Sequence, residues 1–413
     1  MSAQPIYDVA ICGGGLVGAS LAIALAQLQL KVALIESHPF GAIDQPSFDE
    51  RTTALSNGSR RVFEGLGVWP SMVREATPIR RIHVSDKGRF GFARIEASEQ
   101  GLEQLGHVVV NRTIGAALWQ RLQTLPIEII APARVTHVVL ESDHRRIDFE
   151  RAGVSTSIQA KLVVAADGAK SVAREAVGIA AESWDYEQTA LVTNVLTQRF
   201  HDYVAYERFT PSGPIAILPM SDGRAGVIWT LAPDHATEML ALDDAAFLAR
   251  FQEAFGFRLG RFTKVGRRQS YPLMLTRSDA HVAERIAVLG NAAQALHPIA
   301  GQGFNLGLRD VASLAEVLAD ARSPTTAFDA GDGLVLHRYR AWREDDRREI
   351  VRFTDGLVRL FRQSFGPIKL VRDLGLLAFD LLPPAKAAMA QLSLGAAGRV
   401  PRLARGASLV SRS

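Results

Sequence analysis

The stretch YDVAICGGGLVGASLAIALAQLQLKVALIE, residues 7–36, decides the fold of this chain. An apolar, β-prone run from Tyr7 to Cys12 leads into a cluster of glycines. A small-residue apolar segment, Ala19–Leu28, and a second apolar run, Val32–Ile35, follow. This order predicts a strand, a tight turn, a helix and a second strand that ends at Glu36. Such a βαβ unit begins an α/β fold.

Gly13, Gly15 and Gly18 match the pattern G-x-G-x-x-G in the context that the motif requires. The first glycine allows the tight turn, the second lets the backbone approach a pyrophosphate, and the third lets the helix close on the strand. Glu36 is positioned to bind ribose hydroxyls and disfavours a 2′-phosphate. The stretch therefore predicts binding of FAD or NAD rather than NADP, and the alternative is a structural glycine turn.

Composition limits the possible classes of protein. The chain has 413 residues, 47% of them hydrophobic and 22% charged, which fits two or three packed domains and excludes a short binding module. A formal net charge of +4 gives no indication of bulk nucleic-acid binding. No acidic residue follows Asp380, so the C-terminal tail is locally positive.

The predicted cellular setting is cytoplasmic. Cys12 is the single cysteine, which excludes an intrachain disulfide and a multi-cysteine metal site, and no signal peptide is recognisable. No uncharged apolar run is long enough to cross a bilayer, and the ten histidines lack metal-ligand spacing. The apolar segment Leu374–Leu382 beside the basic tail is either a peripheral contact with the inner face of the membrane or an ordinary core helix.

Two later segments repeat the strand-and-turn pattern of the N-terminus. The run Leu162–Ala166 ends at Asp167, and the run Ile286–Leu289 ends at the Gly-Asn pair 290–291. Helical spacing predicts a helix over Phe304–Ala319. Strand-like segments punctuated by turns predict a second, mostly antiparallel sheet, and from residue 336 the pattern becomes helical. The strand-like segments lie within Ile79–Ile95 and Thr189–Tyr271.

These motifs resemble those of the flavin-dependent aromatic hydroxylases of the p-hydroxybenzoate hydroxylase type. The glycine motif is followed by Asp167-Gly168 with Arg174, and then by a third motif that opens at Gly290 and continues through 297–305. Within that family the chain resembles the ubiquinone-biosynthesis branch, and within the branch the enzymes that hydroxylate a 2-polyprenyl-6-methoxyphenol. The segments that carry the likeness to the branch are 49–56, 82–86, 207–210, 218–224 and 270–273.

The resemblance implies a fold and a division of the chain. The expected fold is α/β, with a Rossmann-like FAD-binding domain, a second, mostly antiparallel β-sheet substrate domain and a C-terminal helical region. The FAD-binding domain would comprise residues 1–78, 101–182 and 272–335, the substrate domain 79–100 and 183–271, and the helical region 336–413.

The resemblance also implies a set of cofactor-binding residues. Asn291 stands where the wider family has an aspartate that bonds the ribityl chain, and Arg51 corresponds to an arginine that reaches the pyrophosphate or the flavin edge. Asn111 lies where relatives have a polar residue that contacts the flavin, and it is also expected to be the N-cap of a helix over Thr113–Leu122; the two roles are compatible. His297 and Pro298 are candidates for lining the flavin, and no catalytic base is assigned. The full FAD-binding set is Gly13, Gly15, Gly18, Glu36, Arg51, Asn111, Asp167, Gly290, Asn291, Pro298, Gly301, Gln302, Gly303 and Asn305.

The activity implied by the resemblance is monooxygenation with FAD, NAD(P)H and O2. The oxygen would pass through a C4a-hydroperoxyflavin to the free ring position of a prenylated phenol, which gives the benzoquinol. Two alternatives remain open within the pathway: a sister hydroxylase that acts at another ring carbon, and a non-catalytic flavoprotein subunit of a multi-enzyme ubiquinone-biosynthesis assembly. A flavin reductase or a halogenase on a similar scaffold is a third.

Overall fold

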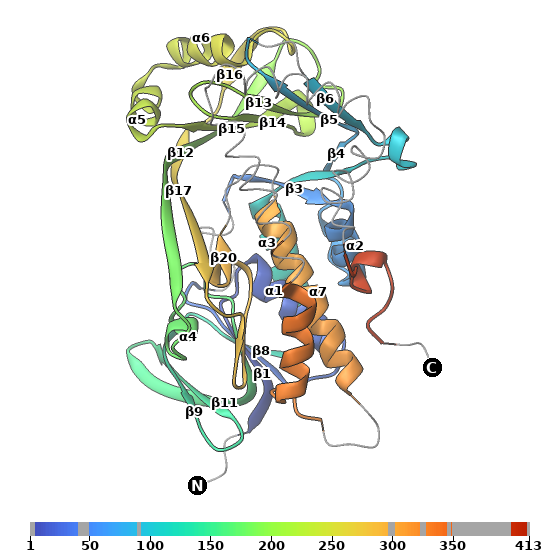
Figure 1. Cartoon of the computed structure of the whole chain (residues 1–413), viewed down its shortest axis with the longest axis vertical. Coiled ribbons are helices and arrows are strands. Elements are labelled where there is room, and N and C mark those ends of the chain that lie inside the picture. The colour runs from blue at the N-terminus through green and yellow to red at the C-terminus, as the bar shows by residue number, and fades with distance from the viewer. Residues whose placement is uncertain are drawn as a thin grey trace.

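The computed structural model describes residues 5–39, 49–88, 92–295, 302–322, 328–344, 348 and 398–410. Three sheets organise these residues: an eight-stranded, a nine-stranded and a three-stranded one. Figure 1 shows the nine-stranded sheet at one end of the molecule, and the eight-stranded sheet with its helices at the other. The mixed α/β fold with a second, mostly antiparallel sheet is therefore confirmed.

The eight-stranded sheet contains the predicted βαβ unit. Its main path is β18-β19-β11-β1-β2-β8, and the pairs from β19 to β8 are all parallel. A hairpin of β9 and β10 continues β11 in antiparallel pairing. The strands are β1 (Ile6–Cys12), β2 (Val32–Ile35), β8 (Ile127–Ile130), β9 (Arg134–Leu140), β10 (Arg145–Arg151), β11 (Val154–Ala165), β18 (Val282–Ala283) and β19 (Ile286–Val288).

Both faces of this sheet are buried, which is why β1 is apolar at nearly every position. Val9 and Ile11 face a core shared with the long helices, whereas Ala10 and Cys12 face the β9–β10 side. The helices are α1 (Leu16–Ala26), α2 (Asn57–Gly65), α3 (Asn111–Leu122), α4 (Val172–Glu175) and α7 (Gln302–Ala321), and residues 333–344 are also helical. The prediction of a helix over Phe304–Ala319 is confirmed by α7.

The nine-stranded sheet is antiparallel except for one pair, β13 with β5. One of its faces packs against α5 (Pro233–Ala241) and α6 (Asp244–Phe255), as Ile217 and Trp229 do against Phe247. The strands are β5 (Arg81–Asp86), β6 (Phe92–Glu96), β12 (Ala181–Thr197), β13 (Val204–Phe209), β14 (Ile215–Pro219), β15 (Arg224–Leu231), β16 (Phe262–Val265), β17 (Gln269–Ser278) and β20 (Gln294–Ala295).

Two features join the ends of the molecule. Strands β12 and β17 pair from Ala181–Ser278 at one end to Val192–Gln269 at the other, and Figure 1 shows them extending from the nine-stranded sheet towards the eight-stranded one. The small sheet lies beside the open face of the nine-stranded sheet, where Val108 and Ala205 share a core. Its strands are β3 (Thr52–Ser56), β4 (Thr77–Ile79) and β7 (Gly106–Val110).

The described part of the C-terminal tail packs on α7. Arg402 pairs with Asp320, its backbone N–H donates to Glu316 over 2.6 Å, and Leu403 is buried. The positive charge that the sequence places here is therefore partly neutralised. The apolar segment Leu374–Leu382 lies outside the described residues. Within the described part of the chain, no helix is long and apolar enough to cross a membrane.

We predict that Asp310→Asn lowers the free energy of unfolding by about 3–5 kcal/mol, because it replaces the carboxylate of a buried ion pair with a neutral amide. Asp310 on α7 bonds Arg343 over 2.8 Å, and the two side chains are 1% and 0% exposed. Urea unfolding measures the effect. Glu182→Gln, which breaks an exposed pair with Arg277, is the control and should change stability by at most about 1 kcal/mol. Equal losses in the two variants would contradict the prediction.

Candidate cofactor-binding site

The carboxyl ends of four parallel strands bring three of the sequence motifs together. Gly13 donates its N–H to Ile35 O over 2.8 Å, immediately before Glu36. On the other side of β1, Ala166 N donates to Cys12 O over 2.8 Å, and Asp167 follows. Leu289 N in turn donates to Ala165 O over 2.9 Å, which sets Gly290 beside this row. Ligands of open α/β sheets bind at this edge.

Gly13 and Gly18 are required by close backbone contacts. Gly13 has φ +103°, and a Cβ there would lie 2.5 Å from Ala166 O. A Cβ on Gly18 would lie 1.9 Å from Gly13 O, so only glycine lets α1 begin this close to β1. The predicted roles of the first and third glycines are consistent with this geometry, and the atoms nearest a Cβ on Gly13 belong to Ala166 and Asp167, which follow β11.

Glu36 is fixed by the glycine turn itself. The side chain is 5% exposed, and its Oε2 accepts from Gly14 N over 2.6 Å. Its Oε1 accepts from His38 N over 2.8 Å. A carboxylate has about four acceptor positions, so Oε2 keeps capacity for a ligand hydroxyl. Gly14, which lies between the motif glycines, is also constrained, since a Cβ would lie 3.1 Å from Trp119.

Arg174 joins the second motif to the third. This buried guanidinium donates through Nη1 to Ala169 O over 3.1 Å and to Ala292 O over 3.0 Å. Asp167 accepts from Ser171 Oγ and from the backbone N–H of Ala173. Burial raises the pKa of Asp167, and these two hydrogen bonds act against the rise.

The third motif is described only in part. Gly290 has φ +59° and packs against Val17 of α1, and the side chain of Asn291 is exposed. Gly303, in the first turn of α7, has open space where a Cβ would lie. The predictions for His297, Pro298 and Gly301 fall outside the described residues, and Gln302 is described only as the first residue of α7.

Asn305 bonds other parts of the protein. Its Oδ1 accepts from Ser56 N over 2.9 Å and from Ser59 Oγ over 2.7 Å, and its Nδ2 donates to Ala54 O over 2.9 Å. These bonds tie the first turns of α7 to β3 and α2. The contacts of Asn305 within the protein are therefore structural, and its predicted contact with a cofactor stays a prediction.

Arg51 and Asn111 meet at Asp49, a residue to which sequence analysis gave no role. Arg51 Nε bonds Asp49 Oδ2 over 2.5 Å, and the guanidinium lies 4.7 Å from the centre of the Tyr271 ring. Asn111 Nδ2 donates to Asp49 Oδ1 over 3.3 Å, and Asn111 Oδ1 accepts from Thr53 Oγ1 over 2.6 Å. Segments distant in sequence thus orient the arginine.

The N-cap interpretation of Asn111 is wrong. Helix α3 begins at Asn111 itself, its N-cap is Val110, and no side chain caps it. The physical reason is that Thr53 on the neighbouring strand β3 and Asp49 engage the amide instead. These partners lie about 60 positions earlier in the chain, so the local sequence around Asn111 carries no sign of them.

The site has the properties needed to hold a dinucleotide. The N-cap of helix α1 is Gly15, no side chain caps the helix, and its first turn contains no acidic residue. The first N–H groups of a helix lack partners within it, and together with the positive end of the helix dipole they attract phosphate. Glu36 lies at the end of the neighbouring strand, where a ribose would follow. The described residues therefore fit a dinucleotide.

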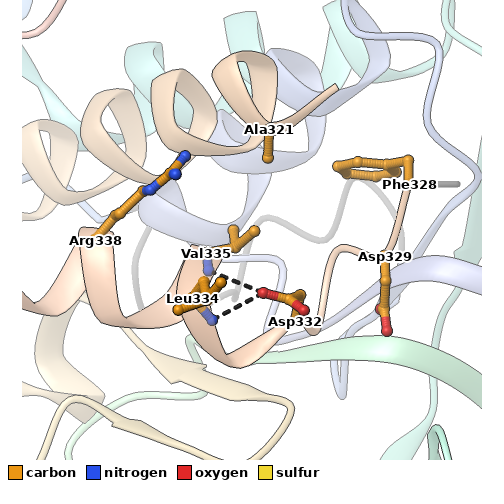
Figure 2. A pocket seen from close by; sticks show the side chains of 7 residues that line it. All are labelled: Ala321, Phe328, Asp329, Asp332, Leu334, Val335 and Arg338. Carbon is orange, nitrogen blue, oxygen red and sulfur yellow. Dashed lines mark hydrogen bonds between the residues drawn. The ribbon is translucent and has the colours of Figure 1, made fainter. Parts of the chain in front are cut away.

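A separate pocket lies beyond the end of α7 and offers no comparable chemistry (Figure 2). Asp332 accepts from the backbone N–H groups of Leu334 and Val335, and Asp329 pairs with Arg285 over 2.8 Å. Arg285 precedes β19, so the pocket is at the amino edge of the parallel strands. Ligand sites of such sheets form at the opposite edge.

Comparison with known proteins gives concordant results. The family described as FAD binding domain matches residues 6–354. "Ubiquinone hydroxylase UbiL" of Rhodospirillum rubrum is 39% identical and covers 99% of this chain and 95% of its own length. "3-demethoxyubiquinol 3-hydroxylase" of Escherichia coli is 33% identical, with coverage of 96% and 100%. Human "Ubiquinone biosynthesis monooxygenase COQ6, mitochondrial" is 30% identical, with coverage of 93% and 92%.

Solved structures show the same fold. The crystal structure of p-nitrophenol 4-monooxygenase PnpA from Pseudomonas putida superimposes with a TM-score of 0.78. The alignment covers 96% of this chain and 100% of that chain, at 19% sequence identity. The likeness therefore concerns the arrangement of the elements.

We predict that Gly15→Val yields a folded protein without FAD. Gly15 has φ −64° and ψ −175°, an extended conformation that valine adopts, so the substitution changes the space in front of α1 without backbone strain. The flavin absorbance that remains after gel filtration measures retention. Gly333→Ala, at an exposed position with open space around its Cβ, is the control. Normal flavin content in folded Gly15→Val would refute the assignment of this glycine.

Proposed function

Since this chain belongs to the FAD-binding family that includes the ubiquinone hydroxylases and ubiquinone-biosynthesis monooxygenases, we propose that it hydroxylates a polyprenylated methoxyphenol in ubiquinone biosynthesis. The sequence resemblance to this branch is confirmed by relatives that match nearly the whole chain. The chain is thus an FAD-dependent monooxygenase. The observation that carries the proposal is the edge where the ends of β1, β2, β11 and β19 converge on an uncapped helix N-terminus.

Bound FAD, once reduced, supplies the activation of O2 and the transfer of one oxygen atom to the ring. In the net reaction, the phenol, O2, NAD(P)H and one proton give the hydroxylated ring, NAD(P)+ and water. The protein binds the cofactor, orients the ring and excludes water. Each of these tasks has candidate residues in the described part of the chain.

The residues that would hold FAD are at the strand edge. The N–H groups at the start of α1 would bind the pyrophosphate, and Glu36 would accept from ribose hydroxyls. Arg51, oriented by Asp49, would extend its guanidinium towards a phosphate or the flavin edge. Arg174 keeps the second and third motifs at a fixed separation through two carbonyl bonds.

The ring would bind against the face of the nine-stranded sheet opposite α5 and α6. Val192, Ala216 and Ile228 on this face are partly exposed, whereas neighbouring residues of the same strands that face the helices are buried. Apolar walls with few polar groups suit an aromatic ring with a prenyl chain. This assignment supports a division into FAD-binding and substrate domains at the boundaries expected from sequence.

The proposal also specifies which carbon of the phenol ring is hydroxylated. We assign hydroxylation of a 2-polyprenyl-6-methoxyphenol at its free activated position, which gives the benzoquinol. The alternative is a sister hydroxylase that acts at another carbon, and the Escherichia coli relative named as a 3-hydroxylase favours it. Both versions use the same cofactor site, so the substrate-facing residues must make the difference.

We also propose a cytoplasmic location with peripheral contact to the membrane, because a polyprenyl chain partitions into the bilayer. The segment Leu374–Leu382, beside a tail without acidic residues, is the candidate contact. Association with a multi-enzyme assembly would serve the same purpose, since a lipid intermediate could pass between enzymes without entering water.

We predict that a deletion strain accumulates 2-polyprenyl-6-methoxyphenol and that the wild-type gene, but not Gly15→Val, restores the quinone. Mass spectrometry of the lipid extract measures the intermediates. Accumulation of a different demethoxy or deshydroxy intermediate would assign the protein to a sister step. An unchanged quinone profile in a strain with no second enzyme for the step would refute the proposed pathway.

A further inference from the structure

Strand β13 presents a carboxylate on the face of the nine-stranded sheet that we assign to the substrate. Ala205 of β13 is in the core that this face shares with the small sheet, and successive side chains of a strand alternate between faces. Glu207, two residues later, is therefore on the same face. A contact on β15 shows that this face is turned towards the small sheet. A Cβ on Gly226 of β15 would lie 3.0 Å from Thr52 Oγ1 on β3.

Apolar side chains surround Glu207 within the sheet. Its cross-strand partners are Ala216 on β14 and Val84 on β5, and Ala216 in turn pairs with Ile228. All four side chains are partly exposed, so the small sheet does not cover this part of the face. Within the described residues, the Glu207 carboxylate makes no hydrogen bond and no ion pair. Burial raises its pKa to about 7.

Neighbouring charged groups do not account for the raised pKa of Glu207. On its own face of the sheet, the titratable groups are Asp86 on β5, Arg224 on β15 and Tyr271 on β17, and Asp49 and Arg51 lie just before β3 in the chain. None of them contributes to the raised pKa of Glu207, whose cause is burial alone.

The basic side chains of the neighbouring positions face the other side of the sheet. Arg208 reaches the C-terminus of α6, where its Nη2 is 4.0 Å from the position of a Cβ on Gly256. His83 meets the Tyr206 ring edge to face, and Tyr206 packs against the core under α6. Glu207 is therefore an acidic group without a counter-charge in the described part of the chain, on an incompletely covered apolar surface.

We propose that Glu207 contacts the substrate and accepts the hydrogen bond, and then the proton, of its phenol hydroxyl. This inference rests on the proposed function. A phenol ring requires apolar walls and one acceptor for its O–H, and Glu207 with Val84, Ala216 and Ile228 provides that combination. An isolated carboxylate with a pKa near the operating pH is suited to act as a general base.

Every proton that moves during hydroxylation has a donor and an acceptor. As the ring carbon forms its bond to the transferred oxygen, the O–O bond breaks and the other oxygen atom leaves towards water; the phenol O–H bond also breaks, and its proton moves to a Glu207 carboxylate oxygen. The ring carbon then loses its own hydrogen as a proton to solvent, and the electron pair restores aromaticity. The former phenol oxygen recovers its proton from Glu207, which ends the cycle as a carboxylate.

The first test is the pH dependence of binding. The probe is 2-methoxy-6-prenylphenol, titrated into the oxidised holoenzyme between pH 5.5 and pH 8.5, with the perturbation of flavin absorbance as the signal. If the ionised carboxylate accepts from the phenol, binding should tighten on the order of tenfold as pH rises through about 7. If the ring merely covers Glu207, desolvation of the charge should weaken binding as pH rises. A weakening or a flat profile in the wild type overturns the proposal.

The second test compares variants. Glu207→Gln should remove the pH dependence of binding and lower the single-turnover rate of hydroxylation while FAD content is unchanged, and Glu207→Asp should restore part of the pH dependence. Glu238→Gln, on α5 on the other side of the sheet, is the matched control and should behave as wild type. Wild-type pH profiles in Glu207→Gln overturn the proposal but leave the proposed function intact. An FAD-loaded wild type that hydroxylates no methoxyphenol overturns both.

Discussion

The structure depends on the contact between the start of α1 and the turn after β1. A Cβ on Gly18 would lie 1.9 Å from Gly13 O, and one on Gly13 would lie 2.5 Å from Ala166 O. These two contacts let the helix, β1 and β11 meet at one point. Because the meeting point is the carboxyl end of parallel strands, it also gathers Glu36, Asp167 and Gly290. Folding and cofactor binding thus require the same glycines.

Local patterns in the sequence predicted the fold well. The alternation of glycines and apolar residues in 7–36 is a short-range signal, and so are the strand and turn that end at Asp167. The two faces of β1 could not be distinguished, because Val9 and Ile11 pack under helices while Ala10 and Cys12 pack under a hairpin, and both environments select apolar residues.

The non-local part of the site could not be predicted from the chain alone. Arg174 bonds Ala292, and Asn111 bonds Thr53 and Asp49, through contacts that only the sheet topology creates. The N-cap interpretation failed for that reason. In the sequence, Glu207 belongs to the segment 207–210, which resembles the ubiquinone-biosynthesis branch, and nothing there indicates a role for its side chain. Its face on β13, the character of its neighbours and its lack of a described partner became available once the register was known.

Glu207 also has a thermodynamic consequence. A carboxyl group whose pKa is raised by folding, from 4.5 to about 7, binds its proton more tightly in the folded chain. The folded state is therefore penalised as pH rises above the unfolded value, and the penalty is complete above about pH 7. A leucine or glutamine at this position would avoid the penalty. An ionisable group that destabilises the fold and lies on an incompletely covered face is the pattern expected of a functional residue, because functional sites are where residues depart from what stability alone would favour.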